Sequence, residues 1–160
     1  MKKFLVIGNP IQHSLSPNLH NYWFKKNNIK AIYEKKLIDE NNISEIILDI
    51  KKDKIQGVNV TVPFKNKVIK YIDQLTDEAN ESQSVNTLYK FNGKIFGHNT
   101  DISGFELSLR HIKYDVKNKR VLILGSGGVV SSIIMALNKM EPLKILLSNR
   151  TQTKAEKIKE

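Results

Sequence analysis

The sequence predicts an α/β fold, in which a mainly parallel N-terminal domain is followed by the first βαβ unit of a second domain. Three observations carry this prediction. Strand-like runs alternate with segments of helical apolar spacing as far as Thr61, which is typical of a parallel sheet. The pair Asn92-Gly93 is the turn signal of a hairpin. A later apolar run, Val121-Leu122-Ile123-Leu124, enters a glycine-rich turn and is followed by a helix and another strand.

The composition limits the classes of protein that fit. With 40% hydrophobic and 26% charged residues in 160 positions, the chain suits one ordinary globular domain or two small ones. It has no cysteine, which excludes a disulfide framework and thiolate chemistry. The formal net charge is +10, but the lysines are scattered, so we expect anionic small molecules rather than nucleic acid as partners. The apolar runs are too short for a leader or a membrane span, which predicts a cytoplasmic protein without a membrane partner.

The first strand is predicted over Lys3–Ile7, and the first helix over Pro17–Lys26. Ser16 is its expected N-cap, and its expected buried stripe consists of Leu19, Tyr22 and Trp23. Ser14 and Ser16 precede the helix start, where free N–H groups and the helix dipole favour an anion. These serines are therefore candidates for holding a carboxylate. The alternative is that Ser16 only caps the helix and Ser14 only shapes the loop.

The next strand is predicted over Ala31–Leu37. A helix follows over Asn42–Lys51, where isoleucines recur at helical spacing. The third strand runs through Val58-Asn59-Val60-Thr61-Val62, with the valines on one face and the two polar residues on the other. This strand–helix–strand–helix–strand order implies parallel pairing.

Pro63 is expected to end the third strand and to open a helix over Phe64–Tyr71. Asn59, Thr61 and Lys65 then gather at the carboxyl edge of the sheet, where ligands bind in open α/β folds. An amide, a hydroxyl and an ammonium suit a small, hydroxyl-rich, anionic ligand. The alternative is a surface turn with a solvated lysine.

The following segments predict a short helix over Asp77–Ser82 and a hairpin over Ser84–Phe91 and Lys94–Gly97, with Asn86 in its first strand. A further helix is expected over Asp101–His111. Its apolar contacts are expected from Phe105, Leu107, Leu109 and Ile112. Asp101 could serve this helix only as its N-cap.

The second unit is predicted from a strand over Val121–Leu124, a helix over Gly128–Lys139 and a strand over Lys144–Leu147. The turn between the first strand and the helix reads Gly125-Ser126-Gly127-Gly128-Val129, whose glycines let a pyrophosphate approach the helix N-terminus. Asn149, Arg150 and Thr151 follow the second strand, where an acidic residue would select NAD. An arginine there suits a 2′-phosphate and so favours NADP. The alternative for Arg150 is a solvated turn residue.

Six motifs occur together and in order. They are Ser14-Leu15-Ser16-Pro17, Asn59-Val60-Thr61-Val62-Pro63-Phe64-Lys65, Val85-Asn86-Thr87, Asn99-Thr100-Asp101, Gly125-Ser126-Gly127-Gly128 and Asn149-Arg150-Thr151. With these motifs the chain resembles the shikimate dehydrogenase family over essentially its whole length. The resemblance implies NADPH-dependent, reversible reduction of 3-dehydroshikimate to shikimate, a step towards chorismate and the aromatic amino acids.

The resemblance also implies residue roles. Ser14 and Ser16 would hold the substrate carboxylate. Lys65 and Asp101 would form the catalytic pair. Hydrogen bonds to the ring hydroxyls would come from Asn59, Thr61, Asn86 and Asp101. The chemistry agrees, because hydride arriving at a ketone carbon creates an alkoxide that a nearby ammonium can protonate. No metal site is predicted.

The resemblance divides the chain into a substrate-binding catalytic domain over 1–101, a connecting segment over 102–117 and the start of a Rossmann-type NADP domain over 118–160. The family continues further, so we expect a fragment that is inactive alone, monomeric or homodimeric when complete. Gln83-Ser84, Ile102 and Val130 depart from the usual family pattern. A quinate-accepting or NAD-using relative and a non-catalytic shikimate-binding protein remain the alternatives.

Overall fold

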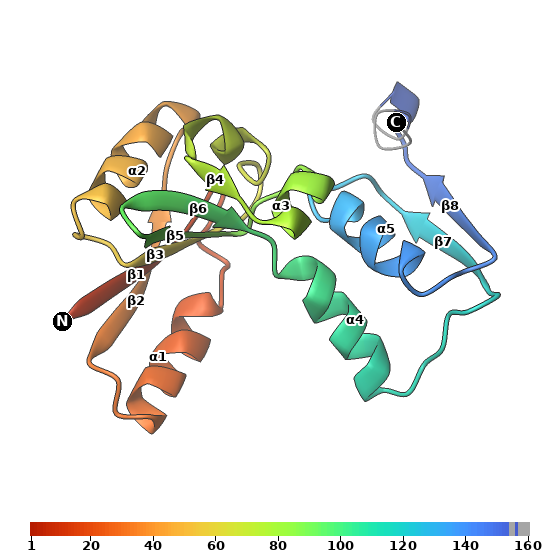
Figure 1. The fold of residues 1–160 in the computed structure, drawn as a ribbon, viewed down its shortest axis with the longest axis horizontal. Helices are drawn as coiled ribbons and strands as arrows, with labels where there is room; N and C mark the ends of the chain where they lie inside the picture. Colours follow the sequence, from red (N-terminus) through yellow and green to blue (C-terminus); the bar gives the residue numbers. More distant parts are fainter. Residues whose placement is uncertain (154–155, 157–160) are drawn as a thin grey trace.

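The computed structural model describes residues 1–153 and 156, and these form two α/β units (Figure 1). The first unit contains a six-stranded sheet with the order β2-β1-β3-β5-β6-β4, and only β5 runs against its neighbours. The predicted mostly parallel sheet is therefore confirmed. Its strands are β1 (Lys2–Gly8), β2 (Ala31–Leu37), β3 (Gly57–Val60), β4 (Gln74–Leu75), β5 (Thr87–Phe91) and β6 (Lys94–His98). The two-residue β4 has no counterpart in the sequence prediction.

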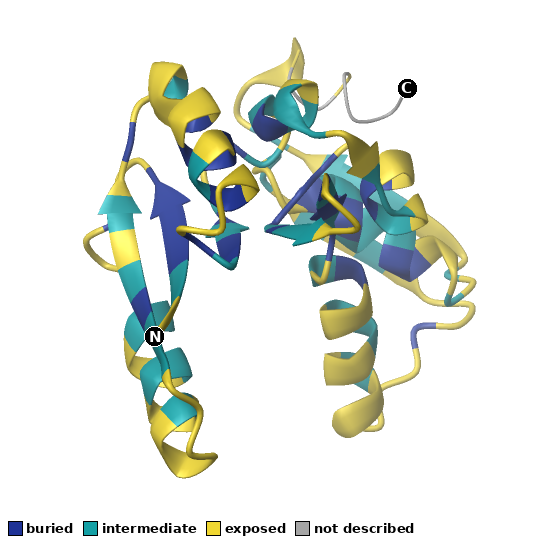
Figure 2. Cartoon of the chain, turned by 60° about the vertical axis from the view of Figure 1, so that its left-hand side comes forward, coloured by how far each residue is buried: buried dark blue, intermediate teal, exposed yellow. Residues whose placement is uncertain are grey.

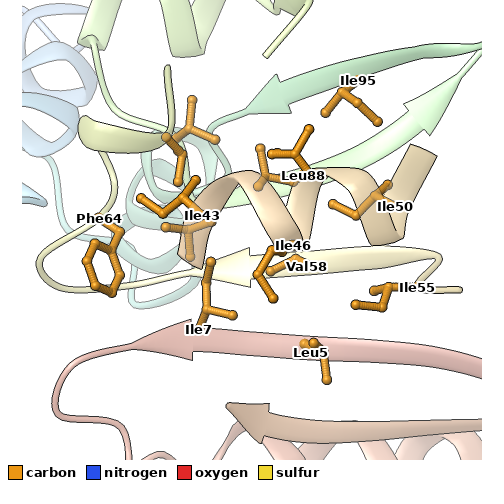
Figure 3. Packing of buried hydrophobic residues seen from close by; sticks show 14 of the residues in the cluster. Leu5, Ile7, Ile43, Ile46, Ile50, Ile55, Val58, Phe64, Leu88 and Ile95 are labelled. Atoms are coloured by element: carbon orange, nitrogen blue, oxygen red, sulfur yellow. The ribbon is translucent and has the colours of Figure 1, made fainter. Parts of the chain in front are cut away.

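Helices cover both faces of this sheet, with α1 (Ser16–Lys26) and α2 (Ile43–Lys51) on opposite sides (Figure 1). The α2 side holds the larger core, in which Ile43, Ile46 and Ile50 are fully buried against Leu5 and Ile7 of β1 (Figure 3). Full burial of such a side chain contributes about 1.5–3 kcal/mol. The helical spacing of the isoleucines thus fixes the side on which α2 lies.

The predicted buried stripe of α1 is wrong. Leu19, Tyr22 and Trp23 are 48%, 59% and 47% exposed, and α1 contains no buried residue (Figure 2). The opposite side of the helix faces the sheet instead. There, Asn21 exchanges two side-chain hydrogen bonds with the backbone of Tyr33, at 2.8 and 2.9 Å, and so satisfies the free edge of β2.

The segment around Pro63 also differs from the prediction. β3 ends at Val60, Val62 is exposed, the Val62–Pro63 peptide is cis, and the following helix is a 3₁₀ segment that begins only at Lys67 (η2, Lys67–Tyr71). The reason is tertiary. The Thr61 N–H still donates to the Ile7 carbonyl at 3.0 Å, and the Phe64 N–H closes a turn onto Thr61 at 2.9 Å. Phe64, which follows this turn, is buried in the core.

The remaining elements of the first unit include a short 3₁₀ turn, η1 (Glu40–Asn42), and a short helix, α3 (Asp77–Ser82). Asn92 and Gly93 both have positive φ, of 48° and 79°, so the predicted hairpin is confirmed with the geometry of a type I′ turn.

The helix α4 (Asp101–His111) leaves β6 and packs against the second unit. Of its expected apolar contacts, Leu107 is exposed, as is Ile112 just beyond the helix, whereas Ile102 is the buried residue. The second unit consists of β7 (Arg120–Leu124), α5 (Val130–Asn138) and β8 (Lys144–Ser148), with β7 and β8 paired in parallel. The predicted βαβ arrangement is present, and α5 begins two residues later than expected. None of the helices in residues 1–153 is both long enough and apolar enough to cross a bilayer.

Candidate functional site

Lys65 and Asp101 meet at the carboxyl edge of the sheet. Lys65 lies in the turn after β3, and Asp101 is the first residue of α4. The Lys65 Nζ lies 2.7 Å from the Asp101 Oδ2, and the two side chains are 13% and 21% exposed. The sequence predicted that these groups meet, and the structure brings them together. Partial burial makes their attraction stronger than that of a pair on the surface.

Asn86 fixes the orientation of the carboxylate. Its Nδ2 donates to the Asp101 Oδ1 at 2.9 Å and to the Thr100 Oγ1 at 2.8 Å. Its Oδ1 accepts from the Thr100 N–H at 3.0 Å and from the Thr87 hydroxyl at 3.0 Å. Both oxygens of Asp101 therefore have partners, and the Lys65 ammonium is held by a carboxylate that cannot swing freely.

Asn59 belongs to the same hydrogen-bond network. Its Nδ2 donates to the Asn86 carbonyl and to the Thr87 Oγ1, both at 3.2 Å, and its Oδ1 accepts from the Tyr33 hydroxyl at 2.7 Å. Both amide hydrogens are thus committed within the protein, and a ligand would find acceptor capacity on Oδ1. Asn59 therefore ties Tyr33 to Asn86 and Thr87 within the network.

Tyr33 is a site residue that the sequence did not indicate. It lies on β2 at 3% exposure and reaches over β1 to Asn59. Burial raises the pKa of the Tyr33 hydroxyl well above its usual value, and a hydrogen bond with Ser16 offsets a part of this rise. The hydroxyl consequently stays protonated at neutral pH and can donate to Asn59.

The two predicted serines lie at the loop between β1 and α1. Ser16 does not cap the helix, because α1 begins at Ser16 itself and its N-cap is Leu15, which makes no side-chain hydrogen bond. The Ser14 Oγ instead accepts from the Ser16 N–H at 3.3 Å. Ser16 lies near the Tyr33 hydroxyl, at the end of the network that runs from Tyr33 to Lys65. Thr61 lies at the same edge, where its methyl group packs on Gly8.

A cavity of about 420 Å³ separates this edge from the second unit. Lys65 lines the cavity and contacts Asp101 at the same time. The size falls in the range of small-molecule and cofactor sites. The first unit contributes Val62, Pro63, Lys65, Asn66, Gln83 and Ser84 to the lining, and the second unit contributes Ser126, Gly127, Gly128 and Ser131.

The glycine turn has the geometry that a phosphate-bearing cofactor requires. Gly125 has a φ of 102°, and a Cβ added to Gly125, Gly127 or Gly128 would find no atom within 4 Å. The backbone N–H groups before α5 are thus open to close approach, and Ser126 and Val129 flank them. The residues present fit a pyrophosphate.

The segment after β8 lies beside this turn, because the Gly125 N–H donates to the Ser148 carbonyl at 2.7 Å. Asn149 closes the segment onto the Thr151 carbonyl at 2.7 Å, and the Arg150 side chain is exposed. None of these three residues lines the cavity, and they follow directly on the strand residue that bonds to the turn. Within residues 1–153 and 156, no cluster of three or more His, Asp or Glu side chains could hold a metal ion.

These features define an α/β protein of two units, in which a carboxylate-held lysine lines one wall of a cavity and a nucleotide-type glycine turn lines the other. Residues 6–88, just over half of the chain, match the family model of the shikimate dehydrogenase substrate binding domain. The chain belongs to this family, which confirms the resemblance found in the sequence.

Relatives and solved structures agree with this assignment. The NADP+ shikimate dehydrogenase of Pelagibacter ubique is 60% identical over 158 residues, which cover 99% of this chain and 60% of that protein. The shikimate dehydrogenase structure from Aquifex aeolicus is 39% identical with a TM-score of 0.91, over 99% of this chain and 59% of that chain. The Thermus thermophilus enzyme in complex with NADP(H) and shikimate is 28% identical with a TM-score of 0.88, over 99% and 59%. The chain thus spans about three fifths of the length of these relatives.

Proposed function

We propose that this chain provides the substrate site, the catalytic pair and the first part of the cofactor site of an NADP-dependent shikimate dehydrogenase. The observation that carries the proposal is Lys65, which lines a cavity shared with the glycine turn and is held at 2.7 Å by the Asp101 carboxylate behind it. The names of the relatives supply the substrate and the cofactor. The same proposal places the protein in the cytoplasm, with shikimate, 3-dehydroshikimate and NADP as its small-molecule partners.

The substrate site is proposed to lie over the carboxyl edge of β1 and β3. Ser14 and Ser16 hold the carboxylate of shikimate at the start of α1. Its ring hydroxyls bond to Asn59, Asn86 and Asp101, which belong to the network, and to Thr61 at the same edge. Asn86 exchanges one of its protein contacts for the ligand, since both its amide hydrogens and both lone pairs of its Oδ1 have partners in the structure. The support is the continuous set of hydrogen bonds from Tyr33 to Lys65, since a wall fixed in advance lowers the entropic cost of binding.

NADPH, when bound, supplies the hydride that reduces the ketone. This chain's own residues deal with the charge that results. The Lys65 ammonium stabilises the developing alkoxide and protonates it at the former ketone oxygen. Asp101 holds the ammonium in the orientation that this proton transfer needs. In the reverse direction, Lys65 takes the proton from the hydroxyl.

The cofactor site is proposed to run along the second unit. Gly125, Ser126, Gly127, Gly128 and Val129 would hold the pyrophosphate at the start of α5. Asn149, Arg150 and Thr151 would bind the 2′-phosphate, with the guanidinium as the main donor. In this proposal, residues 1–101 form the substrate-binding catalytic domain and residues 118–160 form the start of the NADP domain. Residues 102–117 connect the two domains.

The test uses the complete product of the gene that encodes this chain. It measures the shikimate-dependent reduction of NADP+ and, in parallel, of NAD+. Replacement of Lys65 by alanine should lower kcat by about 10²–10⁴-fold, the usual contribution of a general acid–base group. The affinity for shikimate, measured by calorimetry, should stay largely intact. The matched control is Lys90→Ala, because Lys90 is also ion-paired and partly buried but does not line the cavity.

Turnover in Lys65→Ala close to that of the unmodified protein would remove Lys65 from the mechanism. Absence of any shikimate-dependent reduction by the unmodified protein would overturn the proposed function. A preference for NAD+ would contradict the role given to Arg150.

A further inference from the structure

Asn99 is a buried residue between β6 and α4 to which no role has been given above. It is 1% exposed, and three oxygens lie within 3.0 Å of its Nδ2. These are the carbonyl oxygen of Ser84 at 2.8 Å, the Oγ of Ser132 at 2.8 Å and the Oγ of Ser82 at 3.0 Å. The Asn99 amide nitrogen therefore lies where three segments of the chain meet, and both of its hydrogens have acceptors.

The other end of the Asn99 side chain holds the start of α4. Its Oδ1 accepts from the Asp101 N–H at 2.9 Å and lies 3.4 Å from the Ile102 N. The formal N-cap residue, Thr100, makes no side-chain hydrogen bond to the helix. Asn99 thus performs the capping and thereby fixes the backbone of Asp101, whose carboxylate holds Lys65.

Ser132 belongs to the other unit. It is fully buried on α5, the helix that follows the glycine turn. Ser84 adds a second link between the units, because its hydroxyl donates to the Gly128 carbonyl at 3.3 Å. The glycine turn and the Asp101 backbone are therefore joined through one amide group.

We propose that Asn99 is a positioning residue, which, through Ser132, sets the distance between the Lys65–Asp101 pair and the glycine turn. This inference rests on the proposed function. Hydride transfer requires the reacting atoms to lie within about 3–3.5 Å of each other, and a displacement of about 1 Å can cost about a hundredfold in rate. The substrate is held by the first unit and the cofactor by the second, so a bond between the units controls that distance.

The test compares two serine replacements, Ser132→Ala and Ser82→Ala. Both remove a buried hydroxyl that bonds to the same Asn99 Nδ2. Only Ser132 lies across the junction between the units, whereas Ser82 lies in the first unit and also bonds to the Glu78 carbonyl at 2.6 Å. Ser82→Ala therefore loses at least as many hydrogen bonds as Ser132→Ala, but only Ser132→Ala breaks a bond between the units.

In the protein as its gene encodes it, Ser132→Ala should lower kcat by about tenfold and leave the shikimate KM within about twofold. Ser82→Ala should leave both constants within about twofold while it lowers the melting temperature at least as much. Asn99→Ala should show the kcat loss of Ser132→Ala or a larger one, in any preparation that remains folded by circular dichroism.

Equal kcat values for Ser132→Ala and Ser82→Ala would overturn the inference and leave the proposed function standing. So would a rise in the shikimate KM without a change in kcat. If the unmodified protein lacks shikimate-dependent NADP+ reduction, the proposed function fails, and this inference fails with it.

Discussion

Replacement of Tyr33 by phenylalanine tests whether the hydrogen-bond network controls the substrate wall. The change removes one hydroxyl and keeps the ring, which stacks on His20 with the centroids 4.2 Å apart and the planes 6° from parallel. The lost bond is the one from the Tyr33 hydroxyl to the Asn59 Oδ1, at 2.7 Å. Because that bond selects the orientation of the Asn59 amide, its loss also loosens the contacts of Asn59 with Asn86 and Thr87.

The expected loss of stability depends on how far the hydrogen bond between Tyr33 and Asn59 is buried. A hydrogen bond between neutral groups contributes about 0.5–1.5 kcal/mol, and an acceptor left unpaired in a buried place costs about 1–3 kcal/mol. Asn59 is only partly buried, so water can reach its oxygen in part. We therefore expect the free energy of unfolding to fall by about 1–2 kcal/mol. The affinity for shikimate should fall by about fivefold, which corresponds to about 1 kcal/mol.

Urea denaturation measures the free energy of unfolding, and calorimetric titration measures the affinity for shikimate. The matched control is Tyr22→Phe, the same chemical change on the exposed side of α1, which should alter the free energy of unfolding by less than about 0.5 kcal/mol. If Tyr33→Phe is as stable as the unmodified protein and binds shikimate equally well, the bond to Asn59 does not organise the site. A similar loss in Tyr22→Phe would show that the effect is not specific to the network.

Two further predictions concern Tyr33 and Gly8. Because burial raises the pKa of Tyr33, its contribution to stability is complete below the usual tyrosine pKa of about 10 and declines above it. The stability gap between the unmodified protein and Tyr33→Phe, measured in urea, should therefore narrow above about pH 10, and a constant gap would contradict this. A Cβ at Gly8 would lie 2.6 Å from the Thr61 Cγ2 and 3.1 Å from the Val62 carbonyl oxygen, so Gly8→Ala should destabilise by about 1–3 kcal/mol and weaken shikimate binding. Gly104→Ala, on α4 with no atom within 4 Å, should stabilise by about 0.5–1 kcal/mol, and equal responses to the two changes would contradict the packing argument.

The order of strands and helices was predictable because each element carries its own periodicity. The isoleucines of α2 identify its buried face, and Asn92-Gly93 identifies the hairpin, since in both cases the deciding contacts are local in sequence. The helix α1 shows the limit. It carries apolar or aromatic residues on more than one side, and the face that meets the sheet is decided by the bonds between Asn21 and Tyr33, two residues on different elements.

The candidate site was predictable where short motifs place polar groups at strand ends. Lys65 was placed at the sheet edge by its position after a strand, whereas its pairing with Asp101 came from the resemblance to the family; the structure brings the two together because both follow strands whose carboxyl ends share one edge. Tyr33 could not be predicted, because its partner Asn59 lies two strands away across β1. The role of Asn99 was equally hidden, since it depends on Ser132 in the other unit.

Asp101 illustrates how the network serves chemistry as well as structure. A carboxylate has about four lone-pair positions, and the protein uses one on each oxygen, for Asn86 and for Lys65. Capacity therefore remains for a substrate hydroxyl, which Asp101 can accept without releasing the ammonium. Asn86 and Asn59 bring no charge, so the only ion pair among the proposed substrate residues is the one between Lys65 and Asp101. In the proposed reaction, a proton would move between Lys65 and the substrate oxygen while the neighbouring groups stay in place, which is the condition for electrostatic stabilisation without reorganisation.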